Sequence, residues 1–202
     1  MTIPMMEIEL SGVWQGVQTA PSRQYKCGFC DSLVGTESGW WCYEGTPNGT
    51  GYILICTHCN RPTFFDDRVG GQYPGPTVGN PVRFLPKEIG RLYQEARATF
   101  SVNAYTPTVL ALRKLLMNIA VNKGAKEGQS FQQYGDYLAQ GYVSQENKGW
   151  VDHIRKKGND ANHEIPLMER LDAEDLLNST EMLSKIVYEF PGRVNEKQTA
   201  SS

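Results

Sequence analysis

Two short motifs, Cys27-Gly28-Phe29-Cys30 and Cys56-Thr57-His58-Cys59, decide how the N-terminal part of this chain is expected to fold. Two residues between a pair of cysteines let both sulfur atoms point to one centre from a tight turn. Two such turns supply the four thiolates of a tetrahedral zinc site. We therefore predict a Zn²⁺ ion bound by Cys27, Cys30, Cys56 and Cys59.

The predicted zinc site is structural rather than catalytic. Four thiolates complete the coordination of zinc, so no position is left for a substrate. Zinc would instead add folding energy to a segment that is too small for a core of its own. His58 lies inside the second turn, between two cysteines, and is interpreted as a bystander. Cys42 follows two tryptophans and is predicted to be a buried or partly buried free thiol.

Composition sets the class of protein. The chain has 202 residues, 40% of them hydrophobic and 21% charged, with a formal net charge of -2. Such a chain does not bind nucleic acid over its whole surface, because duplex affinity depends largely on Lys and Arg. The first residues lack the basic start and apolar run of a signal peptide, and no stretch is apolar enough for a membrane span. We therefore expect a cytoplasmic protein with no membrane partner. In the reducing cytosol, paired cysteines more often hold metal than form disulfides.

Turn-forming residues and hydrophobic periodicity divide the chain. Gly70 to Pro76 are rich in Gly and Pro, which cannot continue a helix or a central strand. After Pro86 the apolar residues recur with a helical period. The expected organisation is an N-terminal arm (1–25), a zinc-ribbon-like module (26–69), a linker (70–85), a helical bundle (86–191) and a polar tail (192–202).

The bundle is expected to contain about five helices. They begin near Pro86, Thr106, Ser130, Ser144 and Asp172. Ser130 with Gln133 forms a capping-box pattern for the third helix. Pro191 is expected to end the fifth. The predicted fold class is therefore mostly α, with a small β-rich zinc-ribbon-like module in front of the bundle.

The most unusual stretch of the helical half runs from Trp150 to His163. If the helix continues past Gly158, Asn159 and His163 share one face, and Lys156 lies one turn earlier. A histidine with an amide and a cation could cleave RNA without metal, since imidazole transfers protons near neutral pH. The alternative is that His163 caps the helix or bonds within the bundle, while the run from Arg155 to Lys157 is a solvated face.

The helical half resembles the HEPN superfamily, in particular its bacterial and phage domain-of-unknown-function branch with a cysteine-pair module in front. The resemblance rests on the two cysteine pairs and on three further stretches, which are 86–89, 111–116 and 155–163. It implies a helical bundle that often forms a homodimer. Many HEPN proteins are endoribonucleases in toxin–antitoxin, phage-defence and CRISPR systems.

The resemblance implies candidate site residues. His163, Asn159 and Arg155 are the candidate catalytic residues, and Lys156, Lys157 and Arg113 are candidate binding residues. The position of the family's motif arginine is held by Gly158, and Arg155 lies farther from His163 than the family spacing. Loss of such a cation removes a group that stabilises charge on the phosphate in the transition state.

Three functions follow from these observations. The first is a zinc-stabilised, non-catalytic HEPN-like module that binds RNA, a nucleotide or a protein partner in a host–phage conflict. The second is a metal-independent endoribonuclease that uses His163. The third is a purely structural protein that dimerises or serves as an adaptor.

Overall fold

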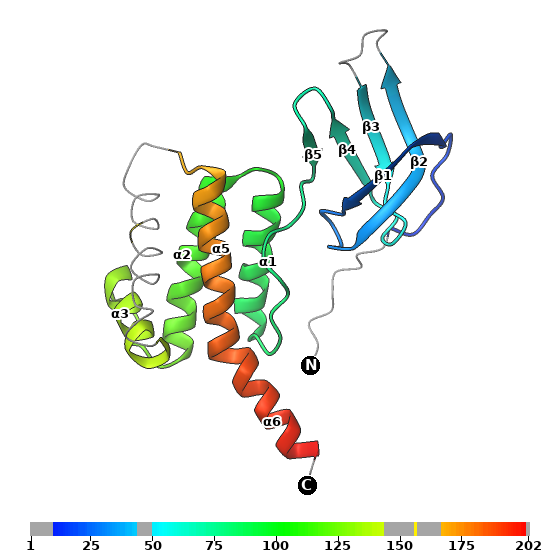
Figure 1. Cartoon of the computed structure of the whole chain (residues 1–202). Coiled ribbons are helices and arrows are strands. Elements are labelled where there is room, and N and C mark those ends of the chain that lie inside the picture. Colours follow the sequence, from blue (N-terminus) through cyan, green and yellow to red (C-terminus); the bar gives the residue numbers. More distant parts are fainter. Residues whose placement is uncertain (1–9, 44–49, 144–155, 157–166, 201–202) are drawn as a thin grey trace. The chain divides into compact units, whose positions relative to one another are not determined.

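The computed structural model describes residues 10–43, 50–143, 156 and 167–200. The chain divides into two compact units, residues 1–77 and 78–202 (Figure 1). We call them the sheet unit and the helical unit.

The sheet unit is a five-stranded antiparallel sheet in which each strand pairs with the next one along the chain. The simple order β1-β2-β3-β4-β5 means that every connection is a hairpin, which antiparallel neighbours permit. The strands are β1 (Gln18–Lys26), β2 (Leu33–Tyr43), β3 (Thr50–Ile55), β4 (Pro62–Asp66) and β5 (Gly71–Tyr73).

The core of the sheet unit is small and includes cysteines. Tyr25 meets Phe65 edge to face, with ring centroids 4.9 Å apart. Buried Leu54 and Val34 lie in the same cluster, and so do three cysteines of the predicted zinc site. A core of this size gives little hydrophobic stabilisation by itself, so a further cross-link is needed to hold the hairpins together.

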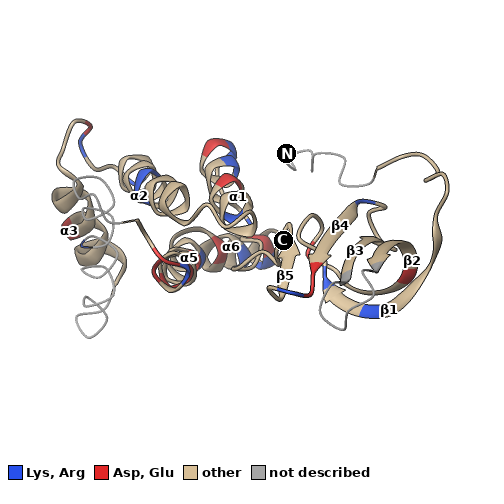
Figure 2. Cartoon of the chain, turned by 90° about the horizontal axis from the view of Figure 1, so that it is seen from above, with Lys and Arg blue, Asp and Glu red and all other residues tan. Residues whose placement is uncertain are grey.

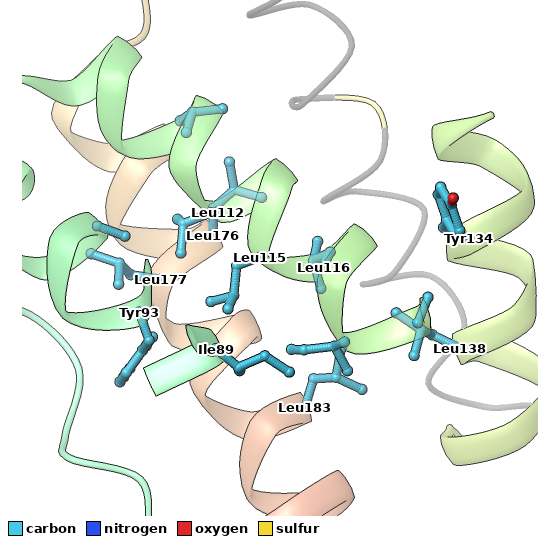
Figure 3. Close-up of a cluster of buried hydrophobic side chains, with 14 of the residues drawn as sticks. Ile89, Tyr93, Leu112, Leu115, Leu116, Tyr134, Leu138, Leu176, Leu177 and Leu183 are labelled. Atoms are coloured by element: carbon cyan, nitrogen blue, oxygen red, sulfur yellow. The ribbon is translucent and has the colours of Figure 1, made fainter. Parts of the chain in front are cut away.

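The helical unit has a larger core, drawn in Figure 3. Four of the described helices contribute leucines or aromatic residues with close to zero exposure, among them Tyr93, Leu112, Leu138 and Leu176. The helices are α1 (Lys87–Ser101), α2 (Tyr105–Asn122), α3 (Phe131–Tyr142) and α5 (Arg170–Ser184), which continues through the π-helix η2 (Lys185–Glu189) into α6 (Phe190–Ala200). Among the described residues, no helix has both the length and the apolar character needed to span a membrane.

The predicted fold class is wrong in its proportions. The described residues hold a five-stranded sheet and then four helices, with α6 a continuation of the last, so a mostly α protein with a five-helix bundle is not supported. The sheet begins within the segment predicted as an arm and ends within the one predicted as a linker. The first and last strands, β1 and β5, are polar or rich in Gly. Such a composition does not favour a strand by itself, so these segments become strands through pairing with their neighbours. The predicted helix from Ser144 lies outside the described residues.

The last helix also differs from the expectation, because it does not end at Pro191. In a regular helix the proline ring crowds the carbonyl four residues earlier and no N–H is available to bond it. Here the preceding turn is π-helical, and the N–H of Phe190 bonds the carbonyl of Lys185, five residues back. The wider turn relieves the crowding, and the chain stays helical through Ala200.

The segment that enters the helical unit, residues 78–83, is bonded to α1, α5 and η2, and we call it the strap. Arg97 donates hydrogen bonds to the carbonyls of Val78 and Gly79, at 3.0 and 2.8 Å. The carboxylate of Glu181, which is 8% exposed, accepts the N–H of Asn80 at 2.8 Å. These charged hydrogen bonds fix backbone that the sequence predicted as linker.

Candidate metal centre

Two tight turns carry the four cysteines, and they have the same backbone structure. In the first, between β1 and β2, the N–H of Cys27 bonds the carbonyl of Ser32 at 2.9 Å, and the N–H of Asp31 bonds the carbonyl of Cys27 at 3.0 Å. The residue after the second cysteine, Asp31, has a φ of 61°. A short side chain such as Asp tolerates this left-handed conformation.

The second turn, between β3 and β4, repeats this pattern. The N–H of Cys56 bonds the carbonyl of Arg61 at 3.0 Å, and the N–H of Asn60 bonds the carbonyl of Cys56 at 2.9 Å. Asn60, at the position equivalent to Asp31, has a φ of 58°. The two turns belong to the first and third hairpins of the sheet, so they present their cysteines from the same end of it.

The four sulfur atoms meet. The Sγ atoms of Cys27, Cys30, Cys56 and Cys59 all lie within 4.8 Å of one another. The two contacts between the turns, Cys27 with Cys59 and Cys30 with Cys56, measure 3.8 Å each. A tetrahedral ion with metal–sulfur bonds of about 2.3 Å requires sulfur atoms roughly 3.8 Å apart. The donor set therefore fits a metal ion, and the prediction that these cysteines form one cluster is confirmed.

The pKa values of the cysteine thiols favour a bound cation at the centre of the four sulfur atoms. Burial raises the pKa of Cys27 to about 11 and also raises the pKa of Cys59. Burial acts in the same direction on Cys30, but hydrogen bonds from Ser32 overcome it and lower its pKa to about 6. Four adjacent thiolates are therefore unfavourable at neutral pH by themselves. A bound divalent cation would stabilise them, since ligating cysteines are deprotonated.

A close backbone contact supports the first turn. A Cβ atom added to Gly28 would lie 2.3 Å from the carbonyl oxygen of Gly75 and 2.8 Å from that of Pro74. The same region is joined by Gln72, whose side chain donates to the carbonyls of Lys26 and Pro74 at 2.8 and 3.0 Å. Only glycine permits this approach.

Sequence reasoning missed this contact and the role of Asp31 and Asn60. An Asp or Asn directly after each C-x-x-C was a signal for the left-handed position. No sequence signal indicated the partner of Gly28.

Cys42 was predicted to be buried or partly buried, but it is exposed on β2. His58 is exposed and does not belong to the sulfur cluster.

The candidate residues of the helical half are not brought together by the described structure. Arg155, Lys157, Asn159 and His163 lie outside the described residues, and Lys156 is described alone, as exposed. The guanidinium of Arg113 lies 4.1 Å from the ring centroid of buried Phe131, and burial lowers its pKa. The cation–π contact shows that the side chain packs within the helical unit.

The helical unit contains a match to a known protein family. The model of the family described as "Domain of unknown function (DUF4145)" matches residues 94–200, slightly more than half of the chain. The chain belongs to the DUF4145 family. The match begins inside α1 and extends to the end of α6, so it includes residues 192–200 of the predicted polar tail. The cysteine turns precede it. Neither the curated proteins nor the solved structures give a match. The HEPN relationship stays a prediction.

Proposed function

We propose that this DUF4145 protein binds one Zn²⁺ as a structural ion through Cys27, Cys30, Cys56 and Cys59, and that it works as a binding module rather than as an enzyme. The observation that carries the proposal is the convergence of four Sγ atoms within 4.8 Å from two matching turns. Four thiolates fill the coordination sphere of zinc, so the ion would stabilise the fold and would not activate a substrate.

Zinc is preferred among the metals that such a site can take. Thiolates select soft or borderline ions, and a tetrahedral four-sulfur set indicates zinc or iron. Zinc is redox-inert and suits a role that consists of joining two hairpins over a small core. Iron bound by four thiolates would make the purified protein coloured, so the two metals are easily distinguished.

We further propose that the helical unit binds a ligand, and RNA is the first candidate to test. A nucleotide and a protein partner are the other two candidates. The HEPN resemblance supports this choice, and it also suggests a homodimer and a setting in host–phage conflict. The substitution of Gly158 for the motif arginine favours binding over cleavage.

The test uses a labelled RNA with single-stranded and structured parts, incubated with the zinc-loaded protein at low and at moderate salt. We expect a complex that weakens as salt rises, and an RNA that remains intact on a denaturing gel. Cleavage that persists with chelator and disappears in His163→Ala would replace this proposal with the endoribonuclease. Absence of an RNA complex at low salt would contradict RNA as the ligand.

A further inference from the structure

A cavity of about 400 Å³ lies in the sheet unit, beside the second cysteine turn. Its walls are made by residues 10–12 before β1, by Thr36 and Ser38 of β2, and by Ile55 with the turn that follows it. The volume falls within the range of about 300–1,000 Å³ that is typical of small-molecule sites. Cys56 borders the cavity but is 1% exposed, and its sulfur belongs to the metal cluster.

Hydrogen bonds fix the wall before β1 to the turn. The N–H of Leu10 bonds the carbonyl of Cys59 at 2.9 Å. The side-chain amide of Asn60 donates to the carbonyls of Leu10 and Gly12, at 2.8 Å each. The indole N–H of Trp14 in turn donates to the carbonyl of Asn60 at 2.9 Å. The cavity is therefore preformed, and a ligand would not have to order its walls on binding.

Most of the side chains that line the cavity are polar and carry no fixed charge. They are those of Ser11, Thr36, Ser38, Thr57, His58 and Asn60. The Thr36 side chain is 4% exposed, and its hydroxyl accepts the N–H of Ser38 at 3.1 Å, so it keeps its own proton to donate. Among the described residues, no group is bonded to the side-chain hydroxyls of Ser11, Ser38 and Thr57. Several hydroxyls that can both donate and accept thus gather around one cavity.

Charge decides between the classes of ligand. No Asp, Glu, Lys or Arg is among the described residues that line the cavity. Glu37 lies between Thr36 and Ser38 on β2, but successive side chains of a strand point to opposite faces. Strand β3, which ends at Ile55, carries no charged residue, as Figure 2 shows. A phosphate or carboxylate is held by cationic side chains and a cation by carboxylates, so the lining favours a neutral ligand.

We propose that this cavity binds a small neutral molecule with neighbouring hydroxyl groups, which is the chemistry of a sugar ring, either free or as the ribose of a nucleoside. Each hydroxyl of such a ring donates and accepts, like the side-chain hydroxyls around it. Leu10 and Ile55 offer apolar contact to the carbon atoms of the ring. The proposal goes beyond the proposed function, because the cavity lies in the sheet unit and lacks the cations that RNA binding requires.

The test is a titration of the metal-loaded, full-length chain with D-ribose, D-glucose and adenosine, followed by the NMR shifts of the backbone amides. A neutral ligand of this size is expected to bind with a dissociation constant on the order of 1 mM, so the titration extends to about 10 mM. We expect at least one of the three to give saturable shifts at Ser38, Thr57 and His58 and none in α1. Tighter binding of adenosine than of ribose would identify a nucleoside, and the reverse a free sugar.

Two variants remove single hydroxyls from the lining. Ser38→Ala and Thr57→Ala should each raise the dissociation constant about fivefold, the effect of losing one neutral hydrogen bond. Ser22→Ala is the matched control, because Ser22 is an exposed serine of β1 outside the cavity and its loss should change nothing. Equal metal content and circular dichroism would show that the variants are folded.

Four outcomes would overturn the proposal. They are no saturable shift with any of the three compounds, shifts confined to residues outside the lining, folded variants that bind as the wild type does, and adenosine monophosphate that binds at least tenfold tighter than adenosine. The last preference would require a cation that the lining does not contain. The wild-type titration by itself decides the question if the variants do not fold.

Discussion

Cys27 and Gly28 are neighbours in the sequence, but each is required for a different physical reason. Cys27 is required by chemistry, because a metal needs a thiolate at that position of the turn. Gly28 is required by space, because the backbone of Pro74 and Gly75 lies where a side chain would be. The first demand can be read from the spacing of cysteines. The second depends on packing between segments distant in sequence and has no local signal.

Replacing one ligand tests the chemical demand. Cys27→Ser and Cys59→Ser should each lower zinc affinity by at least tenfold and destabilise the sheet unit, since the binding energy of a structural zinc is folding energy. Cys42→Ser is the matched control, because Cys42 is exposed and outside the cluster. Metal content and chemical denaturation measure both effects. Full zinc binding by Cys59→Ser would contradict a four-cysteine site.

The spatial demand is tested by Gly28→Ala. The methyl group would overlap two backbone carbonyls, and backbone cannot move aside as a flexible side chain can. We expect a loss of about 1–3 kcal/mol in the free energy of unfolding of the sheet unit. Gly35→Ala is the control, because a Cβ there has no neighbour within 4 Å. Equal stability of the two variants would mean that the contact is not made in solution.

At the scale of elements, local signals were sufficient for some segments and insufficient for others. Ser130 and Gln133 predicted the start of α3, and both hydrogen bonds of the capping box are present. A capping box acts within one turn and does not depend on the rest of the fold. By contrast, β5 lies in a Gly/Pro-rich stretch and is a strand only because β4 offers it partners. The π-helix before Pro191 likewise reflects packing that periodicity does not reveal.

The strap gives an element-scale prediction of pH dependence. Burial alone would raise the pKa of Glu181, but hydrogen bonds from Lys185 and Asn80 hold it below its ordinary value of 4.5. A lowered pKa means that the ionised carboxylate stabilises the folded state above that ordinary value. This stabilisation is lost as the pH falls through the lower pKa of the folded protein.

Glu181→Gln should therefore destabilise the helical unit by about 1–3 kcal/mol at neutral pH and flatten its stability profile below pH 4.5. The control is Glu174→Gln, which removes an exposed pair with Arg170 of a kind that contributes little. Thermal unfolding across the acid range measures both variants. An acid profile identical to that of the wild type would exclude Glu181 as its source.

At the scale of the whole molecule, the order of the two units along the chain could be predicted from the sequence. The proportion of sheet to helix could not. A cysteine-bearing β unit followed by helices was expected from the two C-x-x-C motifs and from the helical period that begins after Pro86. The extent of the sheet was underestimated, because residues 18–26 show no alternation of apolar and polar side chains in the sequence. The units have separate cores, one containing cysteines and the other built from leucines and aromatic residues. Each unit should therefore respond separately to loss of metal.

Chelation should unfold the sheet unit and leave the helical unit folded. Trp14, Trp40 and Trp41 lie in the sheet unit, so tryptophan fluorescence should change while most of the helical circular dichroism remains. The physical reason is that the apolar core of the helical unit contains none of the metal ligands. Addition of zinc should restore the fluorescence. A single transition seen by both signals would contradict independent units.

The central claim is a zinc ion bound by four thiolates, and X-ray absorption spectroscopy of the purified chain at the zinc edge tests it most directly. We predict one zinc per chain with four sulfur neighbours at about 2.3 Å and no oxygen or nitrogen neighbour. Cys42→Ser should give the same spectrum. A zinc with mixed ligands, a different metal, or a folded sheet unit that contains no metal would contradict the account.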